Sequence, residues 1–226
     1  MRRLVLTGAL GGASAVALAV ALALTPASPA LAQPSQQEAL ERISAQLEQA
    51  AVIRATFTQT RQMAALKRPL VTTGRMAISR QHGVLWEIQK PYRMTYVLAE
   101  HQIVEIGPDG VRKERNVRDL PGLAQTSRMF RALLGANTAA LIDVFQVNAQ
   151  SQANAWQIDL TPRNAQMAQA LRGLTVMGGR FVDSIRIDEA GGDSTLIRIH
   201  AAKSDTALSD DELRLFVPAP SGPAKP

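Results

Sequence analysis

The chain has 226 residues, is 46% hydrophobic, and carries 25 Lys and Arg against 19 Asp and Glu, so its formal net charge is +6. It contains no cysteine, which excludes disulfides, a thiol nucleophile and lipidation at a cysteine. Its densest basic run, VRKERNVR at 111–118, contains an acid and no aromatic residue. Because nucleic-acid platforms combine basic and aromatic side chains, we expect no nucleic-acid partner.

Residues 1–32 have the pattern of a cleavable secretory signal peptide. Two arginines at 2–3 precede an apolar run over 4–24, and the small-x-small site ALA at 30–32 precedes Gln33. The apolar run is also long enough to span a membrane, so an uncleaved anchor is the alternative. We expect cleavage and a periplasmic product, in which the loss of both arginines lowers the net charge to +4.

A helix and then a series of strands follow the signal peptide. Ser35 and Glu38 form a capping box before Leu40, Ile43 and Leu47, which recur at helical spacing. The period then changes to two, which is typical of strands. The strands expected in this half are VIRATFTQT (52–60), VTTGRMAISR (71–80), GVLWEIQ (83–89), YRMTYVLAE (92–100), HQIVEI (101–106) and VRKER (111–115), with GPDG (107–110) as a hairpin turn.

Residues 121–146 lose the two-residue alternation and predict two short helices. In the first, Met129 pairs with Leu133 and Phe130 with Leu134 at i, i+4 spacing. Asn137 can cap the second, which is expected to contain the apolar residues Leu141, Val144 and Phe145.

The second half returns to strands before a loose Pro-rich tail at 218–226. The expected strands are AWQIDLTP (155–162), LTVMG (174–178), RFVDSIRID (180–188), STLIRIHAA (194–202) and DELRLFVP (211–218), with a helical turn near Met167 and Leu171 and a hairpin turn at EAGGDS (189–194). We therefore predict one α+β domain over 33–217, built on a largely antiparallel sheet.

The sequence offers no recognisable catalytic or metal-binding motif. His82, His101 and His200 are scattered, and no metalloprotease, nucleophile-elbow, P-loop or dinucleotide motif occurs after residue 32. The acidic turn at 188–193 lacks the spacing of an EF-hand loop. We expect no catalytic residue, metal or cofactor, although catalytic partners distant in sequence and a zinc site from histidines and carboxylates stay open.

The stretch GVLWEIQKPYRMTYVL at 83–98 carries the most informative pattern. Side chains alternate faces along a strand, so Val84, Trp86 and Ile88 share one face, as do Met94 and Tyr96 after the proline. Such a bulky apolar stripe packs either into a sealed core or against a cavity that holds an apolar ligand.

The chain resembles the LolA family, the periplasmic carriers of outer-membrane lipoproteins, and in particular a divergent LolA-like branch. The similarity is carried by residues 55–98, by IDLTP at 158–162, by VDSIRIDEAGGDSTLIRI at 182–199, and by LRLFVPAPSG at 213–222, which matches the family's closing strand. The resemblance implies an incomplete antiparallel β-barrel with an N-terminal helix and short helices that form a lid over a hydrophobic cavity.

The same resemblance implies roles for individual residues. The acyl cavity would be lined by Phe57, Met76, Ile78, Val84, Trp86, Ile88, Met94 and Tyr96. The lid helices would contribute Met129, Phe130, Leu133, Leu134, Leu141, Val144 and Phe145, which would fill the cavity when no cargo is present. Arg80 corresponds to a family arginine that bonds to lid carbonyls and keeps the cavity shut. The next residue, Gln81, stands where the family often has proline, and a surface arginine is the alternative interpretation of Arg80.

The resemblance therefore implies a monomeric carrier that receives lipoprotein from an inner-membrane donor complex and passes it to an outer-membrane acceptor. Three alternatives remain at this point. The cargo could be another acylated lipid or a glycolipid, the protein could be a lipid-sensing regulator, or it could be a hydrolase, which the missing nucleophile motifs disfavour.

Overall fold

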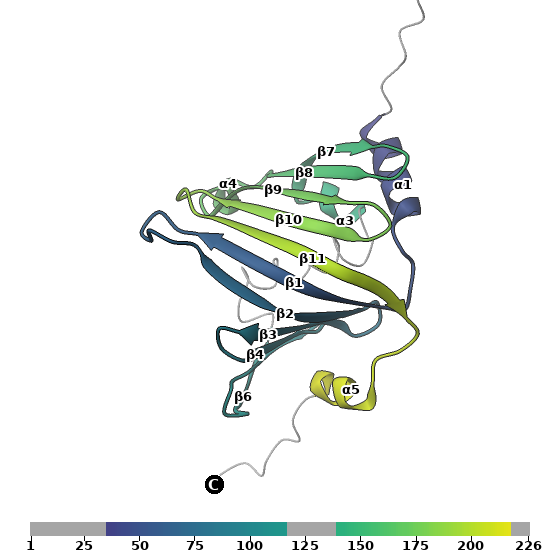
Figure 1. Ribbon diagram of the computed structural model, residues 1–226. Coiled ribbons are helices and arrows are strands. Elements are labelled where there is room, and N and C mark those ends of the chain that lie inside the picture. Colours follow the sequence, from purple (N-terminus) through teal and green to yellow (C-terminus); the bar gives the residue numbers. More distant parts are fainter. Residues whose placement is uncertain (1–34, 117–138, 218–226) are drawn as a thin grey trace, which may run out of the picture. The chain divides into compact units, whose positions relative to one another are not determined.

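The computed structural model describes residues 35–116 and 139–217, which lie in one compact unit, Pro34–Pro226 (Figure 1). The helices are α1 (Gln36–Gln46), α3 (Ala139–Ile142), α4 (Ala165–Ala168) and α5 (Asp210–Phe216). The strands are β1 (Val52–Gln62), β2 (Leu70–Ser79), β3 (Gly83–Lys90), β4 (Met94–Leu98), β5 (Gln102–Ile106), β6 (Arg112–Asn116), β7 (Phe145–Ser151), β8 (Trp156–Pro162), β9 (Leu171–Gly178), β10 (Val182–Glu189) and β11 (Ser194–Asp205).

All the strands belong to one antiparallel, 11-stranded sheet in the order β6-β5-β4-β3-β2-β1-β11-β10-β9-β8-β7. Strands β1–β6 form one meander and β7–β11 form a second. The two meanders are joined where β1 pairs with β11, with Phe57 opposite Ile199. The sheet is open, because β6 and β7 end the order without pairing to each other. This confirms the largely antiparallel sheet of the predicted α+β domain.

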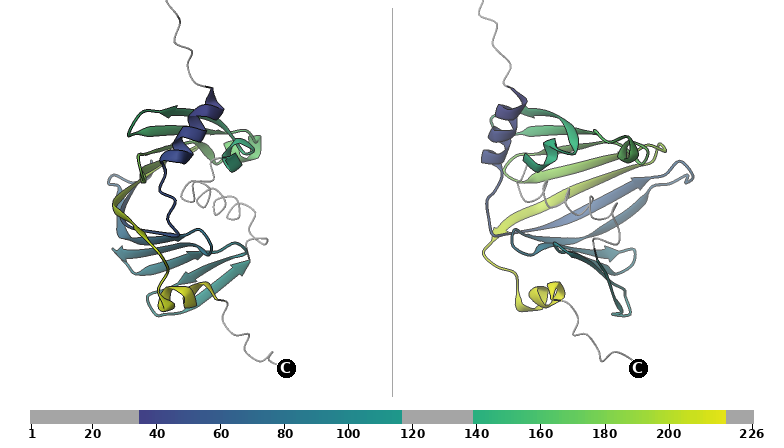
Figure 2. Two further views of the ribbon diagram at one scale, coloured as in Figure 1. Left: turned by 90° about the vertical axis from the view of Figure 1, so that its right-hand side faces the viewer. Right: turned by 180° about the vertical axis from the view of Figure 1, so that it is seen from behind.

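The sheet bends so strongly that one face of both meanders contributes to a single apolar cluster, which we call the inner cluster (Figure 2). Trp86 of the first meander and Val176 of the second both belong to it, as do Leu40 and Ile43 of α1. Helix α1 begins with the predicted capping box, in which Ser35 and Glu38 satisfy each other's backbone N–H groups.

A second apolar cluster, the outer cluster, lies on the opposite face of the first meander. It combines Ala77, Leu85 and Val97 of the strands with Phe216 of α5, among others. Leu85 and its neighbour Trp86 belong to different clusters, as the alternation of side chains along a strand requires. The C-terminal end of α5 is held by Arg112, whose guanidinium donates to the carbonyls of residues 215 and 217 at 3.1 and 2.8 Å.

Two predicted elements differ from the structure. DELRLFVP was expected to be a strand, and the resemblance implied a closing strand there, but residues 210–216 form α5. Ser209 and Glu212 make a second capping box, and the acids in the first turn favour the helix N-terminus, so local capping outweighs the apolar alternation. Phe145 was assigned to a lid helix but begins β7, because α3 ends at Ile142.

The lid region lies partly outside the described residues. Met129, Phe130, Leu133 and Leu134 fall between 117 and 138, so the first predicted lid helix stays a prediction. Among the residues that are described, no helix has both the length and the apolar character that crossing a membrane requires.

Candidate functional site

The residues predicted to line the cavity gather on one face of the first meander. Phe57, Met76, Ile78, Val84, Trp86 and Ile88 are all buried members of the inner cluster, whereas Met94 and Tyr96 are half-buried and pack against it. The register places Met76 opposite Trp86 and Trp86 opposite Tyr96, so these side chains form a row across three strands. Burial, followed by the charge of Glu105 on the paired strand, raises the pKa of Tyr96.

Two aromatic rings form the centre of this surface. Phe57 and Trp86 stack with their ring centroids 3.8 Å apart and their planes inclined by 28°. Gly74, which pairs with Phe57 across β1 and β2, makes room for this arrangement. A Cβ at Gly74 would lie 2.8 Å from Phe57 Cζ and 1.9 Å from the carbonyl oxygen of Glu87, so no other residue fits there without displacing the strand.

The second meander supplies the other half of the same apolar surface, which the predicted cavity residues did not include. Its contribution comes from every other residue of five strands, namely Phe145, Ala149, Trp156, Ile158, Leu160, Leu174, Val176, Ile185 and Ile197. The two-residue alternation in β8–β11 was readable from the sequence, whereas β7 was not predicted. The alternation could not show that their apolar faces share one cluster with Trp86, because that depends on the pairing of β1 with β11.

Two described residues of the predicted lid also contact this surface. Leu141 of α3 is buried in the inner cluster, and Val144 packs against it. Phe145 is buried there too, but from a strand rather than from a helix. Ser79 and Thr195 are the only buried polar residues within 35–116 and 139–217, so the inner surface offers apolar contacts and no charged group.

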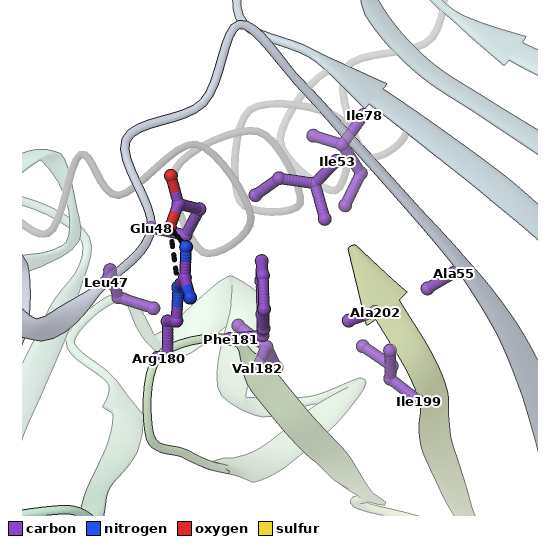
Figure 3. A pocket seen from close by; sticks show the side chains of 10 residues that line it. All are labelled: Leu47, Glu48, Ile53, Ala55, Ile78, Arg180, Phe181, Val182, Ile199 and Ala202. Atoms are coloured by element: carbon purple, nitrogen blue, oxygen red, sulfur yellow. Dashed lines mark hydrogen bonds and ion pairs between the residues drawn. The ribbon is translucent and has the colours of Figure 1, made fainter. Parts of the chain in front are cut away.

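A small pocket lies beside the first residues of β1 (Figure 3). Its walls are largely apolar and come from Leu47, Glu48, Ile53, Ala55, Ile78, Arg180, Phe181, Val182, Ile199 and Ala202. Its internal volume is about 20 Å³, which is enough for a water molecule. An acyl chain cannot enter this pocket unless its walls move apart.

The segment that connects α1 to β1, residues 47–51, closes this pocket on the side of the second meander. Glu48 forms an ion pair with Arg180 at 2.7 Å (Figure 3). The Glu48 backbone N–H also donates to the Arg180 carbonyl at 2.7 Å. The Arg180 guanidinium lies 5.5 Å from the ring centroid of Phe181, which projects into the pocket. These contacts tie the connecting segment to the turn between β9 and β10.

Arg80 holds the same segment from the first meander. Its side chain is exposed and donates a hydrogen bond to Oε1 of Gln49, and its backbone N–H donates to the carbonyl of Ala51 at 3.2 Å. The lid carbonyls expected as partners of Arg80 belong mainly to residues 117–138, which are not described, so that interaction stays a prediction. We call the contacts of residues 47–51 with Arg80 and Arg180 the double clamp.

Nothing in the described ranges suggests a metal centre, since no three His, Asp or Glu side chains gather there as metal ligands would. The candidate functional site therefore consists of the inner cluster, the small pocket and the double clamp. The inner cluster supplies an apolar surface, and the double clamp lies at the rim of the small pocket beside it.

A comparison with protein-family models identifies the family of this chain. The family model described as outer membrane lipoprotein carrier protein LolA-like matches residues 32–212. A search of curated proteins finds no match. A solved structure of a LolA superfamily protein from Nitrosomonas europaea is 8% identical, with a TM-score of 0.46, over 82% of this chain and 99% of that chain.

Two further solved structures are similar at comparable levels. An outer membrane lipoprotein-sorting protein domain from Vibrio parahaemolyticus is 10% identical, with a TM-score of 0.46, over 79% of this chain and 97% of that one. The MucA/MucB complex of Pseudomonas aeruginosa matches at 12% identity and a TM-score of 0.45, over 80% of this chain and 60% of the matched chain.

Proposed function

We propose that this chain, which belongs to the outer membrane lipoprotein carrier protein LolA-like family, is a periplasmic carrier that shields acyl chains of lipoproteins between the inner and outer membranes. The observation that carries the proposal is the continuous apolar inner cluster, to which both meanders and α1 contribute. A surface of this kind can bury an acyl chain, and it offers no buried charged group in the described residues for catalysis. The protein then acts by binding and not as an enzyme, and it needs no cofactor.

The energetics explain why the interior is closed when it is empty. Burial of an acyl chain is worth about 0.8 kcal/mol per methylene, so one long chain contributes roughly 10 kcal/mol before ordering costs. A permanently open cavity with that affinity would retain its cargo. If the empty protein instead packs its own apolar side chains against Phe57 and Trp86, closure competes with cargo and lowers the net affinity.

Opening has to begin where polar contacts close an apolar interior. The double clamp meets this condition, because Arg80 and Arg180 hold residues 47–51 over Ile53 and Ile78, which line the pocket. Arg80 acts in this proposal as a latch, as the family resemblance implies, with Gln49 as its described partner. The segment around Leu141 and residues 117–138 would form the rest of the lid.

Residues 1–32 act as a cleaved signal peptide in this proposal, residues 33–217 form the carrier domain, and residues 218–226 form a tail. The carrier works as a monomer that accepts cargo from an inner-membrane donor and passes it to an outer-membrane acceptor. Native mass spectrometry of protein purified from the periplasm tests the cargo. Bound lipoprotein supports the proposal, bound free lipid or glycolipid reassigns the cargo, and a stoichiometric protein partner indicates a regulator.

A charge placed on the inner surface tests the site itself. Ile88→Asp should abolish binding of a fluorescent fatty acid, because a carboxylate there meets an acyl chain without a polar partner, which costs several kcal/mol. Met177→Asp is the matched control, since Met177 is 46% exposed on the other face of β9. Circular dichroism establishes that both variants fold. A folded Ile88→Asp protein that binds the probe like the wild type would show that the acyl site lies elsewhere.

A further inference from the structure

The connection between β1 and β2, together with the first two residues of β2, carries an unusual combination of side chains. Residues 64–71, which we call the basic tip, are all exposed, and they have the sequence AALKRPLV. From this combination we propose that the basic tip is a docking surface for an anionic phospholipid bilayer, with Leu66 and Leu70 in the interface and Lys67 and Arg68 at the phosphate headgroups.

The apolar side chains of the tip are exposed together, unlike those elsewhere. Leu66 is 44% exposed, and Leu70 and Val71 are each 50% exposed. The other large apolar side chains exposed among the described residues, such as Tyr92 and Met177, occur singly along the chain. Single exposed apolar residues are normal, whereas a cluster of them marks a surface that contacts a partner or a membrane.

The charge of the tip specifies an anionic partner. The sequence contains no Asp or Glu from Gln49 to Trp86. Within the part of the chain that the structure describes, no hydrogen bond or ion pair involves the side chains of Lys67 and Arg68. In contrast, Arg61, at the base of the same hairpin, pairs with Glu189 at 3.1 Å.

Two carboxylates that contact this hairpin, Glu189 and Asp193, are already bonded to it. Glu189 is the partner of Arg61, and Asp193 accepts a hydrogen bond from the Ala64 backbone N–H at 2.9 Å. These contacts fix the base of the hairpin against the turn between β10 and β11, beyond which the hairpin extends (Figure 1). Lys67 and Arg68 therefore lie on an anchored hairpin whose two bonded carboxylates already have partners.

A bilayer surface suits this arrangement better than a folded protein partner does. Leucines that flank Lys and Arg can enter the interface while the cationic groups stay at the headgroups, which is how amphipathic segments bind anionic membranes. Each Lys or Arg near such a surface is worth about fivefold in partitioning. The two apolar and two basic side chains give a weak, reversible attachment, as a carrier that leaves the membrane again requires.

The docking proposal rests on the proposed function in one respect, namely that docking would bring a loaded carrier to a membrane. Physically the two are separable, because the tip lies at the end of β1 distant from the double clamp. The 11 residues of β1 span about 35 Å at 3.3 Å per residue. Changes at the tip should therefore leave acyl binding intact.

Vesicle flotation tests the proposal with protein of residues 33–226, which contains the compact unit. The vesicles are phosphatidylcholine with and without phosphatidylglycerol. The wild type should bind only the anionic vesicles and should lose binding at high salt. Lys67→Ser with Arg68→Ser should weaken binding about 25-fold, and Leu66→Ser with Leu70→Ser on the order of tenfold.

Matched controls lie on the β5–β6 hairpin of the same meander. Lys113→Ser with Arg115→Ser removes the same charge from exposed positions in β6, and Val111→Ser removes an apolar side chain that is 50% exposed. Both controls should bind vesicles like the wild type. Fatty-acid binding is measured for every variant, so that a folding defect or a failure of the proposed function is visible separately.

Three results would overturn the docking proposal. The wild type could fail to bind anionic vesicles, the tip variants could bind as well as the wild type, or the controls could lose as much binding as the tip variants. A protein captured through the tip without vesicle binding would likewise replace the bilayer with a protein partner. Normal fatty-acid uptake in any of these cases would leave the carrier function standing.

Discussion

Ile78 and Leu85 allow a direct test of whether the inner cluster is a binding site or only a core. Ile78 is 7% exposed in the inner cluster and lines the small pocket, whereas Leu85 is 2% exposed in the outer cluster. Replacement of either by Ala removes three carbons from a buried apolar side chain. The two variants therefore suffer the same chemical loss on opposite faces of one sheet.

The magnitude follows from burial. Three methylene equivalents at about 0.8 kcal/mol account for roughly 2.4 kcal/mol, and the remaining cavity brings the total to about 2–5 kcal/mol. For a domain of this size, 1 kcal/mol shifts Tm by about 2–4 °C, so both variants should melt roughly 5–15 °C below the wild type. Scanning calorimetry without ligand measures this shift.

The two variants should diverge when fatty acid is added. Ligand at 100 times its Kd stabilises any binding-competent form by about 2.7 kcal/mol. An acyl chain can also fill the space left by Ile78→Ala, so this variant should bind fatty acid up to about tenfold more tightly than the wild type and gain more in Tm. Leu85→Ala should gain only as much as the wild type. Equal gains in both variants would refute the assignment of the inner face as the acyl site.

Further expectations concern pH, the clamp and the N-terminus. The hydrogen bonds from Arg54 lower the pKa of Glu212 from 4.5 to about 2. This contact should therefore stabilise the fold above pH 4.5, and its contribution should be lost as the pH falls toward 2. After allowance for solvent screening, the free energy of unfolding in urea should vary with pH by about 1–2 kcal/mol less in Glu212→Gln than in the wild type. Arg80→Leu breaks the bond to Gln49 and should slow fatty-acid dissociation about tenfold, with Arg80→Lys intermediate; unchanged dissociation would make Arg80 a surface residue. N-terminal sequencing of the periplasmic protein should begin at Gln33, and an intact membrane-bound chain would indicate an anchor instead.

Local sequence signals predicted most of the fold, and they failed where two of them competed. The capping box of α1 and the alternation in β1–β5 are confirmed. In residues 210–216 the alternation of Leu213 and Leu215 suggested a strand, yet Ser209 and Glu212 have the same capping spacing that identified α1. A capping box fixes backbone hydrogen bonds, whereas a short alternation only describes a pattern of burial, so capping is the stronger signal there.

The candidate site was less predictable, because it depends on contacts between distant parts of the chain. The stripe around Trp86 could be read from alternation, but its stacking on Phe57 depends on the register of β1, β2 and β3. The sequence around Gln49 does not indicate that it bonds to Arg80. The sequence around Arg180 likewise does not indicate that it forms the second half of the double clamp. The assignment of Phe145 to a lid helix was wrong for the same reason, because its pairing with Pro162 in β8 makes it the first residue of β7.

The pairing of β1 with β11 has a consequence for the order in which the protein can be assembled. The Thr56 hydroxyl donates a hydrogen bond to the carbonyl of His200, which is 144 positions later in the sequence. As the chain emerges from the N-terminus, the first meander can form early, but one edge of β1 stays unpaired until β11 has been made. Contacts of such long range slow folding and leave a strand edge open to other chains meanwhile. A nonsense mutation before residue 194 would therefore do more than remove one strand. Without β11, the second meander could not pair with β1, and the apolar faces of the two meanders would not be brought together.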